Sequence, residues 1–213
     1  MSDPVYTIGH STHPIERFIE LLKSQNITAL GDVRSRPYSR MNSQFNLEPL
    51  KQSLRDADIK YVFLGKELGA RSDDKSCYRN GQVQYDLLAQ TELFRRGIER
   101  VKEGARTYRL ALLCAEKEPL ECHRTILVSR RLFEEGVPIR HILADGRIEE
   151  HEHAIKRLIA MLRIPENDLF LPNDAVVSEA YKRQGNEIAY REEAPNTLPS
   201  DRMRRESASR VAE

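Results

Sequence analysis

Short apolar segments alternate with longer amphipathic segments through most of this chain. The apolar segments have the length of β-strands and lie at residues 5–8, 27–34, 61–64, 109–114 and 138–143. Apolar residues recur at helical spacing at residues 14–22, 47–57, 84–102, 124–135 and 149–162. Strands that alternate with helices in this way form right-handed βαβ units. The sequence therefore predicts an α/β fold: one doubly wound, Rossmann-like parallel sheet of about five strands, with helices on both faces.

This α/β domain is predicted to span residues 1–164. An appended segment follows at 165–191, in which residues 176–190 have helical character. From residue 192 to residue 213, prolines and mixed charges stand among few large apolar residues, which predicts a disordered tail. The stretch 65–81 begins and ends with glycine and is rich in polar residues, so we predict a long loop, a type of segment that often serves as a lid.

Charge and cysteine content argue against several classes of protein. The 34 Lys and Arg residues nearly balance the 33 Asp and Glu residues, for a net charge of +1, so nothing global demands a membrane surface or an extended polyanion as partner. An odd count of three cysteines favours a reducing compartment over a disulfide framework. No apolar run approaches the roughly 18 residues of a membrane span, and the first residues do not resemble a secretion signal. We therefore expect a cytoplasmic protein, whose oligomeric state the sequence does not indicate.

The segment from Leu112 to Arg124 carries the strongest chemical signal. It places two thiols, a carboxylate, an imidazole and a guanidinium around one predicted strand-to-helix turn. Ligands of doubly wound sheets bind beyond the carboxyl ends of the strands, where this turn is expected to lie. The positive end of a helix dipole stabilises a thiolate, so the pKa of Cys122 is expected to be lowered.

Cys122 is the favoured nucleophile or redox thiol, and an acid or base must accompany it. Cys114 is a candidate redox or resolving partner, although a cysteine at the end of an apolar strand more often packs in the core. Adjacent residues on a helix diverge by about 100°, so Cys122 and His123 are not expected to share a face. His10, which follows the first strand, is therefore the preferred acid or base, with Glu116 as an alternative.

A metal site and a cofactor are not predicted. Two cysteines and a histidine lie close in sequence, but structural zinc sites use close pairs such as Cys-x2-Cys. Cys114 and Cys122 are separated by seven residues. No glycine-rich phosphate-binding motif is present in the sequence either.

Arginines after the second strand and at the start of the fourth helix predict an anion site. Guanidinium groups and helix N-termini both suit carboxylate or phosphate ligands. Asp32 is interpreted as a partner of arginine, held between Arg34 and Arg124, while Thr12 or His13 is expected to cap the first helix. The candidate ligand-binding residues are Ser11, Asp32, Arg34, Arg36, Ser39, His123 and Arg124.

Several of these motifs resemble the domain-of-unknown-function family 488. The resemblance covers roughly residues 5 to 162 and is most specific at Cys-x-Glu followed by Cys-His-Arg. It implies a small α/β domain and no settled reaction. The motifs are Thr7-Ile8-Gly9-His10-Ser11, Asp32-Val33-Arg34 with Pro37 and Ser39, Leu68-Gly69, and Leu113-Cys114-Ala115-Glu116 with Cys122-His123-Arg124.

Two functions are therefore open at this point. One is a thiol-dependent enzyme that acts on a small anionic or phosphate-bearing substrate. The other is a binding module without turnover that recognises a nucleotide or the end of a nucleic acid, with the cysteines packed in the core. The near-neutral net charge favours a small nucleotide over an extended nucleic acid.

Overall fold

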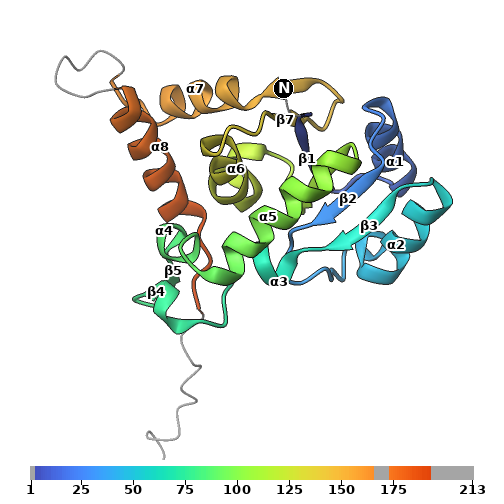
Figure 1. Cartoon of the computed structure of the whole chain (residues 1–213), viewed down its shortest axis with the longest axis horizontal. Coiled ribbons are helices and arrows are strands. Elements are labelled where there is room, and N and C mark those ends of the chain that lie inside the picture. Colours follow the sequence, from blue (N-terminus) through green and yellow to red (C-terminus); the bar gives the residue numbers. More distant parts are fainter. Residues whose placement is uncertain (1–2, 166–172, 193–213) are drawn as a thin grey trace, which may run out of the picture.

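A computed structural model describes residues 3–165 and 173–192 of the chain. Its centre is a six-stranded sheet in the order β3-β2-β6-β1-β7-β8 (Figure 1). The first five strands in this order are parallel, and β8 runs antiparallel to β7 at the edge. The predicted doubly wound, Rossmann-like sheet is confirmed, with β8 as an unpredicted addition. The strands are β1 (Val5–Gly9), β2 (Ala29–Asp32), β3 (Lys60–Phe63), β6 (Leu110–Cys114), β7 (Ile139–Ile142) and β8 (Ile148–Glu150).

Helices cover both faces of the sheet because the central strands are apolar on both sides. In β6, Leu110, Leu112 and Cys114 pack in one core cluster while Ala111 and Leu113 pack in another, as alternate residues of a strand must. The first cluster includes helix α5 and the second includes α1 and α2. These helices are α1 (Ile15–Ser24), α2 (Leu47–Asp56) and α5 (Glu92–Thr107).

The start of α1 differs from the prediction. Its N-terminal boundary residue is Pro14, and no side chain caps it. Thr12 and His13 therefore do not serve as the expected cap. The turn that precedes the helix contains Ser11 with a φ of 51°, which directs the chain away from the helix axis.

The predicted loop at 65–81 contains regular structure. It holds α3 (Gly65–Leu68), a 3₁₀ turn (Lys75–Cys77) and the first strand of a small hairpin, β4 (Tyr78–Arg79) with β5 (Gln82–Val83). The helix predicted at 84–102 is two helices, α4 (Tyr85–Leu88) and α5. They separate because the Thr91 side chain accepts a hydrogen bond from the Phe94 N–H and begins a new helix.

The helix predicted at 124–135 begins as a π-helix. Residues Arg124–Ser129 have the wider π-helical turn, and α6 (Arg130–Glu134) continues them. The Ser129 hydroxyl donates a hydrogen bond of 2.7 Å to the Arg124 carbonyl, five residues back. Such π-turns occur frequently at functional sites.

Two further helices pack against each other and form a third apolar cluster with Leu120 and Ile126. They are α7 (His151–Met161) and α8 (Asn173–Ile188), which run along the top and down the left side of Figure 1. No helix in the described part of the chain has the length and apolar character needed to cross a membrane. Two short 3₁₀ turns complete the elements, at Ser43–Phe45 and Pro119–Glu121. The predicted disordered tail lies, apart from residue 192, outside the described residues.

Two glycines of α5 test the packing of this helix against α3. A Cβ added to Gly97 would lie 2.7 Å from both Glu67 Cβ and a Leu68 methyl carbon, whereas one added to Gly104 meets nothing closer than 3.7 Å. We predict that Gly97→Ala lowers the free energy of unfolding by about 1–3 kcal/mol through overpacking. Gly104→Ala is expected to raise it by about 0.5–1 kcal/mol, since alanine favours the helix. Urea denaturation measures both, and equal effects of the two changes would contradict the packing described.

Candidate functional site

The carboxyl end of β6 and the start of the π-helix bring four reactive side chains together. Cys114 ends β6, Glu116 follows two residues later, and Cys122 and His123 directly precede the π-helix. Their ligand atoms, two Sγ, one carboxylate oxygen and one ring nitrogen, all lie within 4.8 Å of one another. We call these four residues the thiol cluster.

Short contacts join the members of the thiol cluster. Both thiols lie against the same oxygen of Glu116: Oε2 is 2.9 Å from Cys114 Sγ and 3.0 Å from Cys122 Sγ. His123 Nδ1 is 3.5 Å from Cys114 Sγ and 3.9 Å from Cys122 Sγ. The two cysteines and His123 are buried, and only Glu116 is exposed.

The ring of His123 is oriented by the backbone of β2's end. Nε2 lies 3.0 Å from the Val33 carbonyl oxygen, which only accepts, so Nε2 carries a proton. Nδ1 then faces the two sulfur atoms. The prediction that Cys122 and His123 diverge is wrong because Cys122 is not helical: its φ of −134° and ψ of 139° are those of extended chain.

Burial and mutual contact shift the pKa values of the cluster. Burial raises the pKa of Cys114 well above its usual range, and the neighbouring Cys122 adds to this. Burial also opposes ionisation of Cys122, but the hydrogen bond from Cys114 and the charge of Arg124 hold the pKa of Cys122 well below its usual value, the direction expected from sequence. Glu116 is exposed as a residue, but its carboxylate is partly buried against the two thiols, and this partial burial, followed by the charge of Cys122, raises the pKa of Glu116. Burial would lower the pKa of His123, yet contact with Cys122 leaves it raised.

Arg124 forms hydrogen bonds to the backbone of the loop that carries Glu116. This side chain is fully buried, and its Nη1 donates to the Glu116 carbonyl at 2.7 Å and its Nη2 to the Lys117 carbonyl at 3.4 Å. Its backbone N–H points to Cys122 Sγ at 3.4 Å. Arg124 therefore holds the loop after β6 in place. It does not line the pocket described below, and the predicted contact between Arg124 and Asp32 is absent from the described hydrogen bonds and ion pairs.

Asp32 pairs with Arg34, as expected. The guanidinium binds the carboxylate in two places, Nε to Oδ1 at 2.9 Å and Nη2 to Oδ2 at 2.5 Å, and the Arg34 backbone N–H donates to Oδ1 at 3.1 Å. The Tyr61 hydroxyl donates to Oδ2 at 2.9 Å. Burial, and next the Asp32 charge, raise the pKa of Tyr61, so this hydroxyl stays protonated. The carboxylate is fully satisfied and fixes the orientation of Arg34.

A pocket of about 340 Å³ opens beside the thiol cluster. Cys114, Glu116 and His123 line it from the cluster, while Cys122 does not. Arg71, which also lines it, lies with its guanidinium 4.1 Å from the centre of the Tyr190 ring. Further lining residues are Arg34, Ser35, Arg36, Tyr85, Glu121, Ile188 and Tyr190.

Ile188 and Tyr190 were not among the predicted site residues. They lie at and beyond the end of α8, and the backbone there is tied to the β4-β5 hairpin by a bond of 3.0 Å from the Val83 N–H to the Tyr190 carbonyl. No local motif marks these residues in the sequence. Their place in the pocket depends on the packing of α8 against α7 and the turn at Leu120.

Other predicted site residues lie away from this pocket. The side chain of Cys122, the favoured nucleophile, is only 1% exposed and does not line the pocket. His10 is buried, stacks on Phe45 with ring centres 4.3 Å apart, and bonds through Nδ1 to the Ser11 carbonyl at 2.8 Å. Burial lowers the pKa of His10 to about 4. Neither Ser11 nor Ser39 lines the pocket, and the Ser39 hydroxyl instead accepts from a backbone N–H within its own loop.

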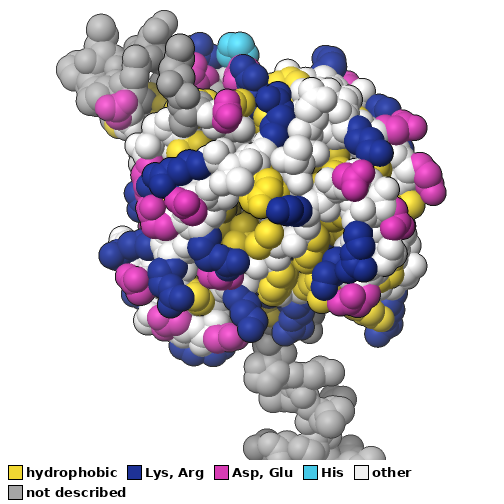
Figure 2. All heavy atoms as spheres, turned by 45° about the vertical axis from the view of Figure 1, so that its right-hand side comes forward, with side chains coloured by type: hydrophobic (Ala, Val, Ile, Leu, Met, Phe, Trp, Pro, Cys, Tyr) yellow, Lys and Arg dark blue, Asp and Glu magenta, His cyan; other side chains and the backbone are white. Residues whose placement is uncertain are grey.

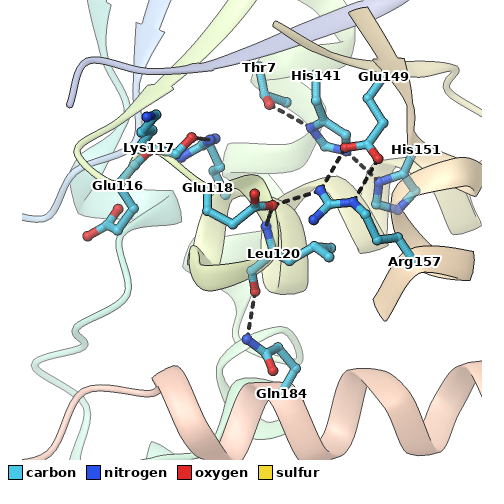
Figure 3. Close-up of polar contacts among 11 residues, drawn as sticks. Thr7, Glu116, Lys117, Glu118, Leu120, His141, Glu149, His151, Arg157 and Gln184 are labelled. Atoms are coloured by element: carbon cyan, nitrogen blue, oxygen red, sulfur yellow. Dashed lines mark hydrogen bonds and ion pairs between the residues drawn. The ribbon is translucent and has the colours of Figure 1, made fainter. Parts of the chain in front are cut away.

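Side chains of α7 and α8 fasten the turn between Glu116 and Cys122 (Figure 3). Arg157 donates to Glu118 at 2.7 Å and to Glu149 at 2.8 Å, and Glu118 accepts from the Leu120 N–H at 3.1 Å. Gln184 of α8 donates to the Leu120 carbonyl at 2.8 Å. The turn between Glu116 and Cys122 is thus held from two elements, α7 and α8.

A buried chain of polar side chains runs past the same region. Thr7 Oγ1 lies 2.8 Å from His141 Nδ1, His141 Nε2 lies 3.0 Å from His151 Nδ1, and His151 Nε2 lies 2.8 Å from the Tyr181 hydroxyl (Figure 3 shows the first two contacts). His151 is the first residue of α7. It is buried because Tyr181 of α8 covers it.

Comparison with known proteins assigns a family. Residues 14–130, more than half of the chain, match the family described as domain of unknown function DUF488. The chain belongs to the DUF488 family. The DUF488 match contains the whole thiol cluster, Asp32 and Arg34, but neither His10 nor the residues of α8 that line the pocket. No curated protein and no solved structure matches the chain.

The buried pair of Asp32 and Arg34 predicts a large effect of one substitution. Asp32→Ala leaves a buried guanidinium without its counter-charge, and we expect it to lower the free energy of unfolding by about 3–5 kcal/mol. Asp145 pairs with Arg147 on the surface, so Asp145→Ala serves as the control and is expected to leave stability unchanged. Chemical denaturation measures both variants. Similar decreases in the free energy of unfolding for the two variants would show that the buried pair contributes no more to stability than the surface pair.

The buried histidines predict a loss of stability in acid. Burial lowers the pKa of His151 to about 4, against about 6.5 in the unfolded chain. Below pH 6.5 the unfolded state binds a proton that the folded state does not, so stability falls as the pH falls from 6.5 towards 4. Between pH 7.5 and 4.5, His151→Gln is expected to lose roughly 2–3 kcal/mol less than the wild type in urea denaturation. An unchanged pH dependence would rule out a neutral, buried His151.

Proposed function

We propose that this protein is a thiol-dependent enzyme that acts on a small anionic or phosphate-bearing substrate. One observation carries the proposal: the residues that line a single pocket include Cys114, Glu116 and His123 together with three arginines, Arg34, Arg36 and Arg71. The sulfur supplies reactivity and the arginines supply a binding site for a negative charge.

Two of the three arginines have charge available for a ligand. Arg34 is bound to Asp32, but Arg36 and Arg71 form no ion pair with a carboxylate in the described part of the chain. Tyr190 holds Arg71 in place by stacking, which reduces the entropy lost on binding. Glu116 and Glu121 also line the pocket and carry negative charge. The anionic group of the substrate is therefore expected to bind near Arg36 and Arg71 rather than throughout the pocket.

Within this proposal Cys114 is the sulfur that meets the substrate, because it lines the pocket and Cys122 does not. Glu116 and His123 lie within contact distance of Cys114 and are the acid and base candidates, in place of the buried His10. Cys122 and Arg124 support the arrangement. All three cysteines are free, which suits work in the cytoplasm.

A nucleotide-binding module is the second candidate, and the tyrosines favour it. Tyr85 and Tyr190 both line the pocket, where aromatic rings suit stacking on a base. Extended nucleic acid is less well supported, since basic and acidic side chains are interspersed over the face in Figure 2. Affinity for nucleic acid would also fall steeply with added salt.

Anion binding tests the first half of the proposal. Inorganic phosphate, pyrophosphate and AMP are titrated by calorimetry into the reduced protein. We expect at least one of them to bind, with Arg36→Gln and Arg71→Gln each weakening it by about tenfold, the loss of a charge-assisted hydrogen bond. Arg40→Gln is the control, because Arg40 is exposed on the same loop and does not line the pocket. An equal loss in the control, or no binding by the wild type, would contradict the anion site.

Turnover tests the second half. A panel of small phosphate esters and carboxylates is incubated with the wild type, Cys114→Ser and Cys77→Ala and followed by NMR. We expect Cys114→Ser to retain anion binding and lose turnover, while Cys77→Ala retains both. Anion binding with no substrate consumed would favour the binding module, and full turnover by Cys114→Ser would exclude a thiol-dependent reaction.

A further inference from the structure

We propose that Cys114, Glu116, Cys122 and His123 form a binding site for a divalent metal ion of the zinc class. This deepens the proposed function by changing the part of the thiols: with a metal bound, the two sulfur atoms would hold the ion, and the ion rather than a free Cys114 thiol would supply reactivity beside the pocket. Metal binding itself depends only on the geometry of the thiol cluster, whereas a part for the metal in turnover rests on the proposed function.

The spacing of the ligand atoms suits a tetrahedral site. Bonds of about 2.0–2.3 Å to nitrogen and sulfur place neighbouring ligand atoms of a tetrahedron roughly 3.3–3.8 Å apart. In the cluster, His123 Nδ1 is 3.5 Å and 3.9 Å from the two sulfur atoms, and Glu116 Oε2 is 2.9 Å and 3.0 Å from them. Shifts of less than an ångström in side chains would meet the ideal values.

His123 is oriented as metal-ligating histidines are. In such sites the ring nitrogen that does not bind metal donates to a carbonyl or carboxylate, which fixes the tautomer. Here the bond from Nε2 to the Val33 carbonyl, at 3.0 Å, leaves the Nδ1 lone pair directed at the cluster.

Charge and burial also favour a cation. The thiols lose their protons when a metal ion binds, and two thiolates and a carboxylate then place three negative charges within 4.8 Å of one another. A divalent cation supplies the missing positive charge. Thiolate and imidazole ligands select zinc-like ions over magnesium or calcium, which prefer oxygen.

The four ligands are unequal. Cys114, Cys122 and His123 are buried, whereas Glu116 is exposed and lines the pocket. Three fixed ligands and one on the solvent side are typical of catalytic zinc sites, in which the fourth position exchanges. The metal would then adjoin the anion site formed by Arg36 and Arg71.

The spacing argument against zinc does not hold in this fold. Close pairs of cysteines are required when one short loop must supply adjacent ligands. Here the end of β6 and the loop after it supply Cys114 and Glu116, and the two residues before the π-helix supply Cys122 and His123. The turn at Pro119–Glu121 spans the separation of seven residues between the cysteines.

Metal uptake by the full-length, reduced protein tests the site. Protein stripped of metal by a chelator is titrated with Zn²⁺ in competition with a chromophoric chelator, and with Co²⁺ as an optical probe. We expect one ion per chain, with Co²⁺ showing sulfur-to-metal charge-transfer absorption and the intense visible bands of tetrahedral coordination. Absence of uptake by the folded, reduced wild type, or Co²⁺ bound without these absorptions, would overturn the assignment.

Matched variants locate the ion. Cys122→Ala is expected to weaken Zn²⁺ binding by at least about tenfold, and Glu116→Gln to weaken it less while keeping the charge-transfer absorption. Cys77→Ala is the control, since Cys77 is also buried and free but lies outside the cluster. Circular dichroism checks that each variant is folded. If Cys122→Ala does not fold, Glu116→Gln still tests the site, because Glu116 is the exposed ligand. An equal loss in Cys77→Ala would place the ion elsewhere, and a Cys114–Cys122 disulfide that forms in place of metal uptake would also refute the site.

The outcome is separable from that of the proposed function. Arg36→Gln and Arg71→Gln are expected to bind Zn²⁺ as the wild type does while they bind phosphate or pyrophosphate less tightly. Metal binding without anion binding or turnover would leave the metal site standing and refute the enzyme. Turnover that needs Cys114 in a protein that takes up no metal would refute the metal site alone.

Discussion

The arrangement of the site depends on how closely the chain after β6 is held against the end of β1. The ladder of these two parallel strands continues beyond both of them, with His10 N–H bonded to the Cys114 carbonyl at 3.0 Å and Ser11 N–H bonded to the Ala115 carbonyl at 2.9 Å. Gly9 allows this approach, because a Cβ there would overlap the Glu116 carbonyl oxygen. The Glu116 carbonyl oxygen also accepts a hydrogen bond from the buried Arg124. Glu116, which lines the pocket, is therefore anchored through its backbone.

Hydrogen bonds hold two buried arginines in place around this anchor. Asp32, Arg34 and Tyr61 satisfy one another on one side, and Arg124 satisfies backbone carbonyls on the other. Breaking any member of such a set leaves a charge or a polar group out of water, so the set resists distortion. The thiol cluster lies between these two groups and gains a defined geometry without a disulfide or any other covalent link.

The residues that line the pocket come from two parts of the chain, which we call the floor (the lining residues between Arg34 and His123) and the outer wall (Ile188 and Tyr190). The floor consists of residues within the DUF488 match, whereas Ile188 and Tyr190 come from the segment that follows it. Gln184 and Tyr181 of the same helix bond to Leu120 and His151, so α8 both braces the floor and shapes the wall. The reactive groups of the pocket therefore come from the DUF488 match, whereas part of the surface that a ligand must fit comes from the segment after it.

The sequence by itself determined the alternation of strands and helices, the parallel sheet and the segment in which reactive groups gather. These features follow from apolar periodicity over a few residues and from the rule that strand ends share one sheet edge. The pairing of Asp32 with Arg34, two residues apart at a strand end, was equally local. Only the tertiary structure decided that Cys122 is extended and shares its surroundings with His123, that His10 is stacked on Phe45 away from the pocket, and that α8 buries His151 and adds Tyr190. Side-chain direction and burial depend on contacts between residues far apart in the chain, which no local pattern encodes.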